Sequence, residues 1–245
     1  MEEINWLFKE KYKNKLSKNY YKDIERLKAG EPVDYVIGFK DFLGTKIDLS
    51  KKTLIPRAET EFWVKSLLCD IKEGAKVLDL FSGSGCIGIV VLKNIQNSKV
   101  VFADKEKNCL EQTRINLRTN KVNGKVVESD VFSNINGKYD YIFANPPYVA
   151  TSKKHLVQKS VLENEPHSAL FGGKDGLFYI KKFLKQAGNF LKPCGKIFME
   201  FSPEQKKKIR ELLSEYGYKN YKFGKDQHNR WRFVVACQSK SDNIK

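Results

Sequence analysis

Apolar and polar positions follow two alternating periods from residue 75 onward. Short apolar runs bounded by turn formers predict strands, and apolar positions three or four residues apart predict helices. The expected strands fall at 76–80, 99–104, 126–128 and 139–144, and the expected helices at 86–92 and 106–118. Strands that alternate with helices predict an α/β fold with a doubly wound, mostly parallel sheet.

The last hundred residues continue this alternation and then change it. A long connection at 149–175, rich in turn formers, precedes the predicted elements of this part. They are a helix at 177–191, a strand at 196–201, a helix at 204–216, and a hairpin made of 218–223 and 231–237. A terminal hairpin adds antiparallel strands to one edge of a parallel sheet.

The first sixty residues carry a weaker pattern. Apolar side chains at Leu16, Tyr20, Ile24 and Leu27 have helical spacing, and they predict one or two short helices that end before Pro32. Residues 33–49 read as short strands around a turn at Gly44. After Pro56 a further helix is expected.

Two more expectations concern this region. Glu59 or Thr60 is expected to cap the helix that follows Pro56. The chain is expected to divide into a short helical segment at 1–32, a β-hairpin connector at 33–53 and the α/β domain at 54–245.

Composition excludes several classes of protein. With 41% hydrophobic and 12% aromatic residues among 245, the chain can bury a sizeable core and does not read as disordered. No run approaches the roughly 18 apolar residues of a membrane helix. The first thirteen residues are charged and lack the apolar stretch of a secretory signal. A cytoplasmic protein without a membrane partner is expected.

Neither cysteine nor histidine is spaced for a metal. The five cysteines include no CxxC pair, and the three histidines are scattered. We therefore expect free thiols in a reducing compartment, with no disulfide framework and no metal site.

The positive charge is concentrated in the last part of the chain. The formal net charge is +16, of which residues 151–245 contribute +11. Such a surface could face RNA or a ribonucleoprotein. Lysine outnumbers arginine 38 to 7, however, and readers of nucleic acid bases rely on arginine. This ratio favours a solvated lysine surface with a weak general attraction to polyanions.

A glycine-rich loop follows the first strand of the predicted sheet. Gly83 and Gly85 allow a sharp turn and a close approach of backbone to a ligand, at the point where a helix begins. Asp104 ends the next strand, where a carboxylate suits the ribose hydroxyls of an adenosine. Gly88 completes a GxGxxG pattern, so a dinucleotide such as NAD stays an alternative to another adenosine-containing cofactor.

The tetrapeptide NPPY, at 145–148, follows the strand 139–144 directly. Its two prolines stiffen the backbone and remove competing N–H groups. The side-chain oxygen of Asn145 and the carbonyl of Pro146 can each accept one N–H, and Tyr148 can pack against a flat group. This arrangement suits a planar NH2 group.

These motifs, with three further segments, give the chain its resemblance to a known family. It resembles the S-adenosylmethionine-dependent methyltransferases, and more closely the HemK family of protein-(glutamine-N5) methyltransferases that modify peptide chain release factors. The resemblance covers about residues 30–240. The carrying segments are GEPVDYVIG at 30–38, LIPRAETE at 54–61, DLFSGSGCI at 79–87, NPPY at 145–148 and EPHSALFGGKDGL at 165–177.

The resemblance implies a Rossmann-like class I methyltransferase fold with a seven-stranded sheet. It implies transfer of a methyl group from S-adenosylmethionine, which leaves S-adenosylhomocysteine, to the glutamine side chain of a release factor's Gly-Gly-Gln tripeptide. The implied cofactor-binding residues are Phe81, Ser82, Gly83, Ser84 and Gly85 at the methionine moiety, Asp104 at the ribose, Asp130 and Val131 at the adenine, and Asn145. The implied substrate-binding residues are Asn145, Pro146, Pro147 and Tyr148; of these Asn145, Pro146 and Tyr148 are implied to be catalytic, with no titrating base.

This chain departs from the family pattern in three places. Phe81 stands where the family often has glycine, Ala58 replaces a proline, and the segment before residue 32 is shorter than the usual helical domain. Three rival functions are an N6-adenine methyltransferase of RNA or DNA, a glutamine methyltransferase of a ribosomal protein, and a non-catalytic Rossmann module.

Overall fold

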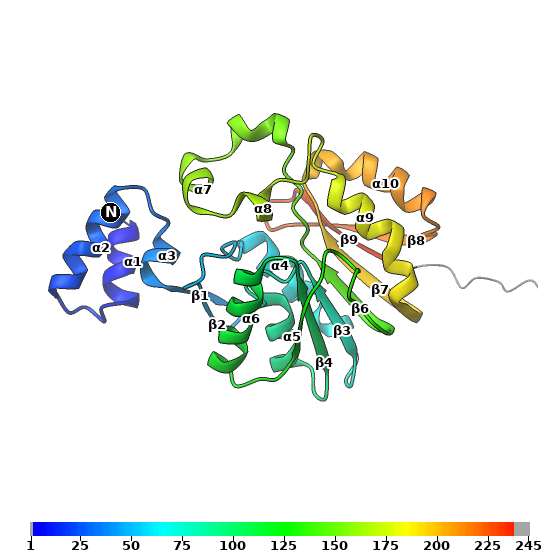
Figure 1. Ribbon diagram of the computed structural model, residues 1–245, viewed down its shortest axis with the longest axis horizontal. Coiled ribbons are helices and arrows are strands. Elements are labelled where there is room, and N and C mark those ends of the chain that lie inside the picture. Colours follow the sequence, from blue (N-terminus) through cyan, green and yellow to red (C-terminus); the bar gives the residue numbers. More distant parts are fainter. Residues whose placement is uncertain (1, 238–245) are drawn as a thin grey trace, which may run out of the picture.

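A seven-stranded sheet forms the centre of the protein in the computed structural model, which describes residues 2–237 (Figure 1). The strand order is β5-β4-β3-β6-β7-β9-β8. The strands are β3 (Lys76–Leu80), β4 (Lys99–Asp104), β5 (Lys125–Glu128), β6 (Tyr139–Ala144), β7 (Leu191–Glu200), β8 (Asn220–Lys225) and β9 (Trp231–Cys237). The first five are parallel, and β9 pairs antiparallel with both β7 and β8. The predicted α/β class and the terminal hairpin are confirmed.

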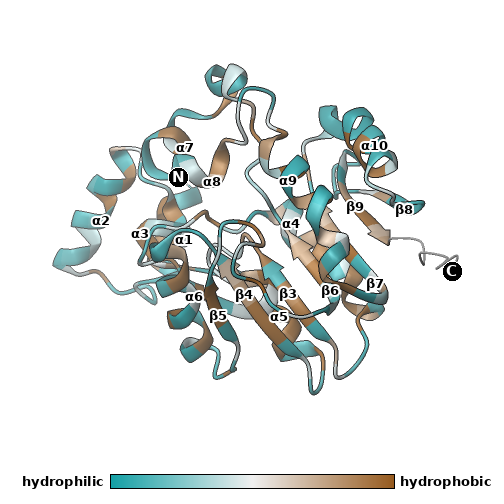
Figure 2. Cartoon of the chain, turned by 45° about the vertical axis from the view of Figure 1, so that its right-hand side comes forward, coloured by the Kyte–Doolittle hydropathy of each residue, from teal (hydrophilic) through white to brown (hydrophobic). Residues whose placement is uncertain are grey.

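Helices cover both faces of this sheet. The bounds are α4 (Ala58–Leu67), α5 (Cys86–Asn94), α6 (Lys107–Thr119), α9 (Phe178–Ala187) and α10 (Lys206–Glu215). Side chains of α4, α5 and α6 pack in one apolar core, and those of α9 and α10 pack in another. The two cores lie on opposite sides of the apolar strands, while the outer helix faces are polar (Figure 2).

Strand β6 shows how the sequence makes two cores. Tyr141 and Phe143 belong to the core under α4 and α5, whereas Ile142 and Ala144 belong to the core under α9 and α10. Successive side chains of a strand point to opposite faces, so a continuously apolar strand must be covered on both. Each fully buried residue of this size stabilises the fold by about 1.5–3 kcal/mol.

The N-terminal part forms a separate small unit beside the sheet (Figure 1). It contains α1 (Glu2–Glu10), α2 (Lys18–Lys28) and α3 (Val33–Ile37), which share a small apolar cluster. The hairpin that follows, β1 (Phe39–Phe42) and β2 (Thr45–Asp48), packs through Phe42 and Ile47 into the core under α4 and α5. The prediction of one or two short helices and of a turn between strands at Gly44 is confirmed. The predicted strand at 33–37 is wrong, because Pro32 opens a helical turn there and Gly38, at φ 94°, ends it. Leu16 lies before α2 and is 64% exposed.

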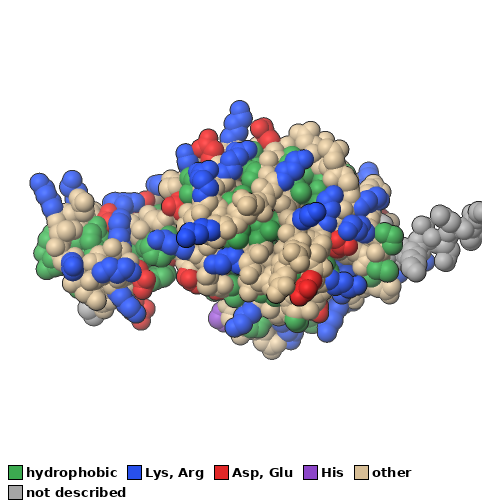
Figure 3. All heavy atoms as spheres, turned by 90° about the horizontal axis from the view of Figure 1, so that it is seen from below, with side chains coloured by type: hydrophobic (Ala, Val, Ile, Leu, Met, Phe, Trp, Pro, Cys, Tyr) green, Lys and Arg blue, Asp and Glu red, His purple; other side chains and the backbone are tan. Residues whose placement is uncertain are grey.

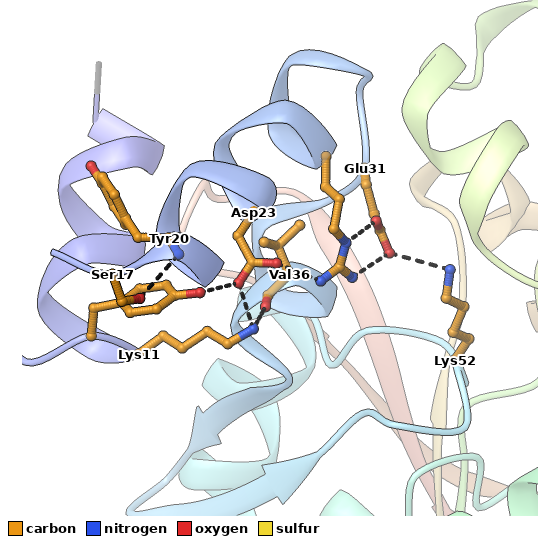
Figure 4. Close-up of polar contacts among 9 residues, drawn as sticks. Lys11, Ser17, Tyr20, Asp23, Glu31, Val36 and Lys52 are labelled. Carbon is orange, nitrogen blue, oxygen red and sulfur yellow. Dashed lines mark hydrogen bonds and ion pairs between the residues drawn. The ribbon is translucent and has the colours of Figure 1, made fainter.

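Charged side chains connect this unit to the larger domain (Figure 4). Asp23 accepts from Lys11, Tyr12 and Arg26 at 2.7–2.9 Å. Arg26 also donates two hydrogen bonds to Glu31, which lower the pKa of that carboxyl. Glu31 in turn pairs with Lys52 at 3.2 Å, at the edge of the larger domain.

One further prediction about a helix is wrong. Helix α4 begins at Ala58, and neither Glu59 nor Thr60 caps it, because both lie inside the first turn. The long connection expected at 149–175 contains η2 (Thr151–Leu156), α7 (Lys159–Asn164) and α8 (His167–Leu170). The remaining short 3-10 turns are η1 (Leu68–Asp70), η3 (Gly188–Phe190) and η4 (Pro203–Gln205).

Lysine and arginine side chains are spread over the face shown in Figure 3 and do not gather in one patch. Within residues 2–237, the helices are all too short or too polar to cross a membrane.

Candidate functional site

A cleft opens at the carboxyl ends of β3, β4 and β6. In doubly wound sheets this end of the strands is where ligands bind. Its walls come from the segment before α4, the glycine loop after β3, the end of β4, the end of β6, and α8. The lining residues include Thr53, Arg57, Thr60, Phe81, Ser82, Gly83, Ser84, Asp104, Asn145, Pro147, Pro166 and Tyr179.

The glycine loop has an unusual backbone. Phe81, Gly83 and Gly85 all have positive φ, at 61°, 53° and 79°. Asp104 fastens the loop from the neighbouring strand by accepting the Gly83 N–H at 2.9 Å. Burial raises the pKa of Asp104, whose second oxygen accepts the backbone N–H of Glu106. Phe81 adopts a conformation that suits glycine, which explains why glycine is common there in the family it resembles.

Two buried hydroxyl groups in the cleft wall have no partner. Within the described residues 2–237, Ser82 Oγ and Thr53 Oγ1 are buried and meet no hydrogen-bond partner, and both residues line the cleft. A buried polar atom without a partner costs free energy, so native proteins satisfy such atoms with a ligand, an ion or water. These hydroxyls therefore suit a polar ligand in the cleft.

The NPPY corner is held from behind by glycines and by Gln205. A Cβ on Gly172 would lie 2.3 Å from the Pro147 carbonyl oxygen, and one on Gly176 would lie 2.2 Å from that of Tyr148. Gln205 Nε2 donates to the carbonyls of Tyr148 and Gly176 at 2.9 and 3.2 Å. The backbone of the NPPY corner therefore passes so close to Gly172 and Gly176 that no side chain fits at either position.

A buried carboxylate lies behind the corner. Glu200, at the end of β7, is 1% exposed and accepts three hydrogen bonds. The donors are Thr60 Oγ1 and Trp63 Nε1, both at 2.7 Å, and the Tyr148 hydroxyl at 2.9 Å. Burial raises the pKa of Glu200, and burial together with Glu200 raises the pKa of Tyr148 far above its ordinary range. The Tyr148 hydroxyl is therefore protonated at neutral pH.

Comparison with known proteins places the chain in a family. Residues 58–174 match the methyltransferase small domain family model. The release factor glutamine methyltransferase of Streptococcus pneumoniae is 35% identical over 222 residues, which cover 89% of this chain and 80% of the relative. The chain belongs to the release factor glutamine methyltransferase family.

Solved structures support the same fold. A methyltransferase from Pyrococcus furiosus superposes with a TM-score of 0.62 at 21% identity, over 91% of this chain and all of that one. A T. thermophilus 16S rRNA N2 G1207 methyltransferase, solved with AdoMet and guanosine, gives a TM-score of 0.60 at 17% identity, over 82% of this chain and 50% of that one. The class I methyltransferase fold expected from the sequence is confirmed, and the chain is a methyltransferase.

Two motifs of the release factor glutamine methyltransferase family meet across the cleft. Arg57 donates to Glu165 at 2.6 Å, and the backbone N–H of Ile55 donates to the same carboxylate at 3.1 Å. Glu165 is 4% exposed, so this pair fastens the segment before α4 to the segment that leads into α8. The IPR sequence at 55–57 and the EP sequence at 165–166 therefore meet in one hydrogen-bonded contact.

The structure gathers some of the predicted site residues and separates others. Phe81, Ser82, Gly83, Ser84, Asp104, Asn145 and Pro147 line the cleft. Gly85 is the N-cap of α5, and Pro146 is buried in the corner. Val131 is 3% exposed within the core, and Asp130 is exposed and paired with Lys182 at 3.2 Å. Their predicted place beside an adenine stays a prediction.

No role in the site was predicted for Trp63 and Glu200, nor for Thr60 and Glu165, which the sequence marked only as parts of the motifs at 54–61 and 165–177. Glu200 had one local signal, an acidic side chain that ends the apolar run Ile197–Met199. A charge in that position is buried only if partners pay its desolvation. Those partners lie 137 and 140 residues away in the sequence, so no local pattern could identify them.

Proposed function

We propose that this protein transfers a methyl group from S-adenosylmethionine to the side-chain amide nitrogen of the glutamine in the Gly-Gly-Gln tripeptide of peptide chain release factors. Family membership supports the substrate class. The observation that carries the chemistry is the place of Asn145: it lines the same cleft as the glycine loop and Asp104. A hydrogen-bond acceptor for the substrate amide thus lies in the same cleft as the residues suited to an adenosine.

The residues of the cleft fit this cofactor. Ser82 Oγ and Thr53 Oγ1 offer buried hydroxyls without partners, and Gly83 brings bare backbone to the wall. Asp104 would accept the ribose hydroxyls, and Ser82 with the loop would hold the methionine end. When bound, S-adenosylmethionine supplies a methyl group already activated by its sulfonium.

The corner would hold and orient the amide. Within residues 2–237, no backbone N–H donates to the Pro146 carbonyl and no hydrogen bond occupies Asn145 Oδ1. These two oxygens would accept the two N–H groups of the glutamine side chain, which places its nitrogen toward the methyl donor. An amide nitrogen is a poor nucleophile, and positioning of this kind can lower a barrier by roughly 7–11 kcal/mol.

No side chain has to act as a base. The Tyr148 hydroxyl stays protonated because its pKa is raised by burial and by Glu200. Its hydrogen bond to Glu200 holds the ring beside the corner, where it would pack against the amide plane. The acceptors Asn145 and Pro146 would stabilise positive charge that develops on the nitrogen.

The test is methyl transfer from labelled S-adenosylmethionine to separate acceptors: a release factor, ribosomal proteins, RNA and DNA. We expect label in the release factor, with mass spectrometry placing one methyl group on the glutamine of its Gly-Gly-Gln peptide. A release factor with that glutamine changed to alanine is the matched control. Label in RNA or DNA only, or in a ribosomal protein only, would overturn the proposal.

A further inference from the structure

The carboxylate of Glu200 fixes the direction of every hydrogen bond around it. Trp63 Nε1 is a donor only, and its ring is held between Phe143 and Phe233 in near-parallel stacks at 6.0 and 5.7 Å. Trp63 therefore donates to Glu200 Oε2, at 2.7 Å. Oε2 must act as an acceptor there.

This requirement fixes the hydroxyl of Thr60, which also meets Oε2 at 2.7 Å. A hydroxyl has one hydrogen, and Thr60 must give it to Glu200. The carboxylate of Glu200 carries no hydrogen, so Oε2 accepts from both Trp63 and Thr60. Thr60 is therefore a donor toward Glu200, and its own oxygen is left as an acceptor.

Asn145 meets that acceptor. Its Nδ2 lies 3.4 Å from Thr60 Oγ1, a long hydrogen bond. The reverse orientation would place the amide oxygen against a hydroxyl oxygen whose only hydrogen is already used. The Asn145 amide is thus oriented with its NH2 group toward Thr60 and its oxygen free.

We propose that Thr60 and Glu200 are positioning residues that hold the Asn145 amide with its oxygen turned to the substrate. The inference rests on the proposed function and deepens it. A free oxygen at Asn145 and a bare carbonyl at Pro146 give the corner two acceptors for the two N–H groups of one amide. Such a site binds the NH2 group of glutamine and repels the carboxylate of glutamate.

The variants follow from the geometry. Thr60→Val keeps the shape of the side chain but removes the acceptor that Asn145 Nδ2 faces, so the amide is free to turn over. Thr60→Ser keeps the hydroxyl. Ser66→Ala removes another hydroxyl from α4, one whose described hydrogen bond is to the Trp63 carbonyl, away from Glu200 and Asn145.

The first readout is methyl transfer to a release factor, with S-adenosylhomocysteine affinity measured by calorimetry as a check on folding. We expect Thr60→Val to lose about 10²-fold in kcat/KM, since misorientation of an aligned group costs this much. Thr60→Ser, which keeps the hydroxyl, should restore activity to within a few-fold of the wild type, and Ser66→Ala should stay within the same range. Equal kcat/KM for Thr60→Val and the wild type would overturn the inference.

The second readout separates orientation from general damage. Affinity is measured for the normal release factor and for one with Glu in place of the Gly-Gly-Gln glutamine. The wild type should bind the glutamine form far more tightly than the glutamate form. In Thr60→Val the ratio of these two affinities should fall at least about tenfold, because the Asn145 amide can turn over and its Nδ2 can then donate to the carboxylate. An unchanged ratio in Thr60→Val would contradict the inference.

Failure of the proposed function is distinguishable from failure of the inference. A wild type that does not methylate release factor overturns the proposed function. A neutron structure of the deuterated protein then still tests the orientation without substrate. The inference is supported if the Asn145 atom that faces Thr60 carries deuterons and if the Thr60 deuteron points toward Glu200. An Asn145 oxygen facing Thr60, with the Thr60 deuteron pointing toward it, overturns the inference.

Discussion

Arg57 and Glu165 form a hydrogen-bonded ion pair of 2.6 Å between segments 108 residues apart. The carboxylate side chain is 1% exposed and the guanidinium side chain is 33% exposed. Because both residues flank the cleft, the pair fixes the distance between two of its walls.

Removing Arg57 should destabilise the protein. Loss of one partner of a buried pair typically costs 3–5 kcal/mol, but the exposed part of Arg57 reduces this, so we expect about 2 kcal/mol for Arg57→Met. Denaturant unfolding measures it. The control is Lys159→Met, in a pair whose side chains are 87% and 53% exposed, where a change of about 0.3 kcal/mol is expected. Equal losses of unfolding free energy in Arg57→Met and Lys159→Met would show that the Arg57–Glu165 pair stabilises the protein no more than an exposed ion pair does.

Gly176→Ala should reduce methyl transfer. The new Cβ would lie 2.2 Å from the Tyr148 carbonyl oxygen, so the NPPY corner has to move. A displacement of about 1 Å at a reacting group can cost about 10²-fold in rate. Gly217→Ala is matched, since both glycines have positive φ, at 73° and 82°, but Gly217 has open space around it.

The Gly217→Ala variant should lose about 1–2 kcal/mol of stability from backbone strain and keep its activity. Similar kcat/KM values for the two variants would show that the contact with the corner does not matter.

Asp79 should make stability depend on pH. Burial raises the pKa of Asp79 to about 8, and its only described hydrogen bond is from the Gly88 N–H. The folded protein therefore binds this proton more tightly than the unfolded chain, whose pKa is about 3.9. The stabilisation from the bound proton is full below pH 4 and is lost as the pH rises to about 8.

Asp79→Asn keeps the acceptor for Gly88 and does not titrate. We measure the free energy of unfolding of Asp79→Asn and of the wild type by denaturant titration at several pH values. The difference in favour of Asp79→Asn should grow between pH 5 and pH 8 and stay constant above pH 8. Parallel curves over the whole range would show that the Asp79 pKa is not raised.

The sequence predicted secondary structure correctly wherever the spacing of apolar residues stayed regular over a whole strand or helix. The strands β3, β4 and β6 were found with their bounds because each is a short, mostly apolar segment that is followed by a turn or a polar segment. Residues 33–37 were misread, since a short, mostly apolar segment fits a strand or a helical turn equally well. There Pro32 and Gly38 decide the outcome through backbone geometry.

For the site, residue type revealed the groups that face the cleft, and only tertiary structure revealed the groups that hold them. The glycine loop, Asp104 and NPPY carry recognisable chemistry over a few residues. Glu200 and Thr60 become meaningful only once β7 lies beside β6 and α4 packs across their ends. Long-range polar partners of this kind leave no periodic signal.

The most direct test of the account is single-turnover methyl transfer to a saturating release factor by Asn145→Ala and by the wild type. With the amide acceptor removed, we expect a rate about 10²- to 10³-fold lower, as for loss of one preorganised polar group in an active site. S-adenosylhomocysteine affinity should change no more than a few-fold. An Asn145→Ala enzyme that turns over as fast as the wild type would contradict the claim that this corner holds the reacting amide.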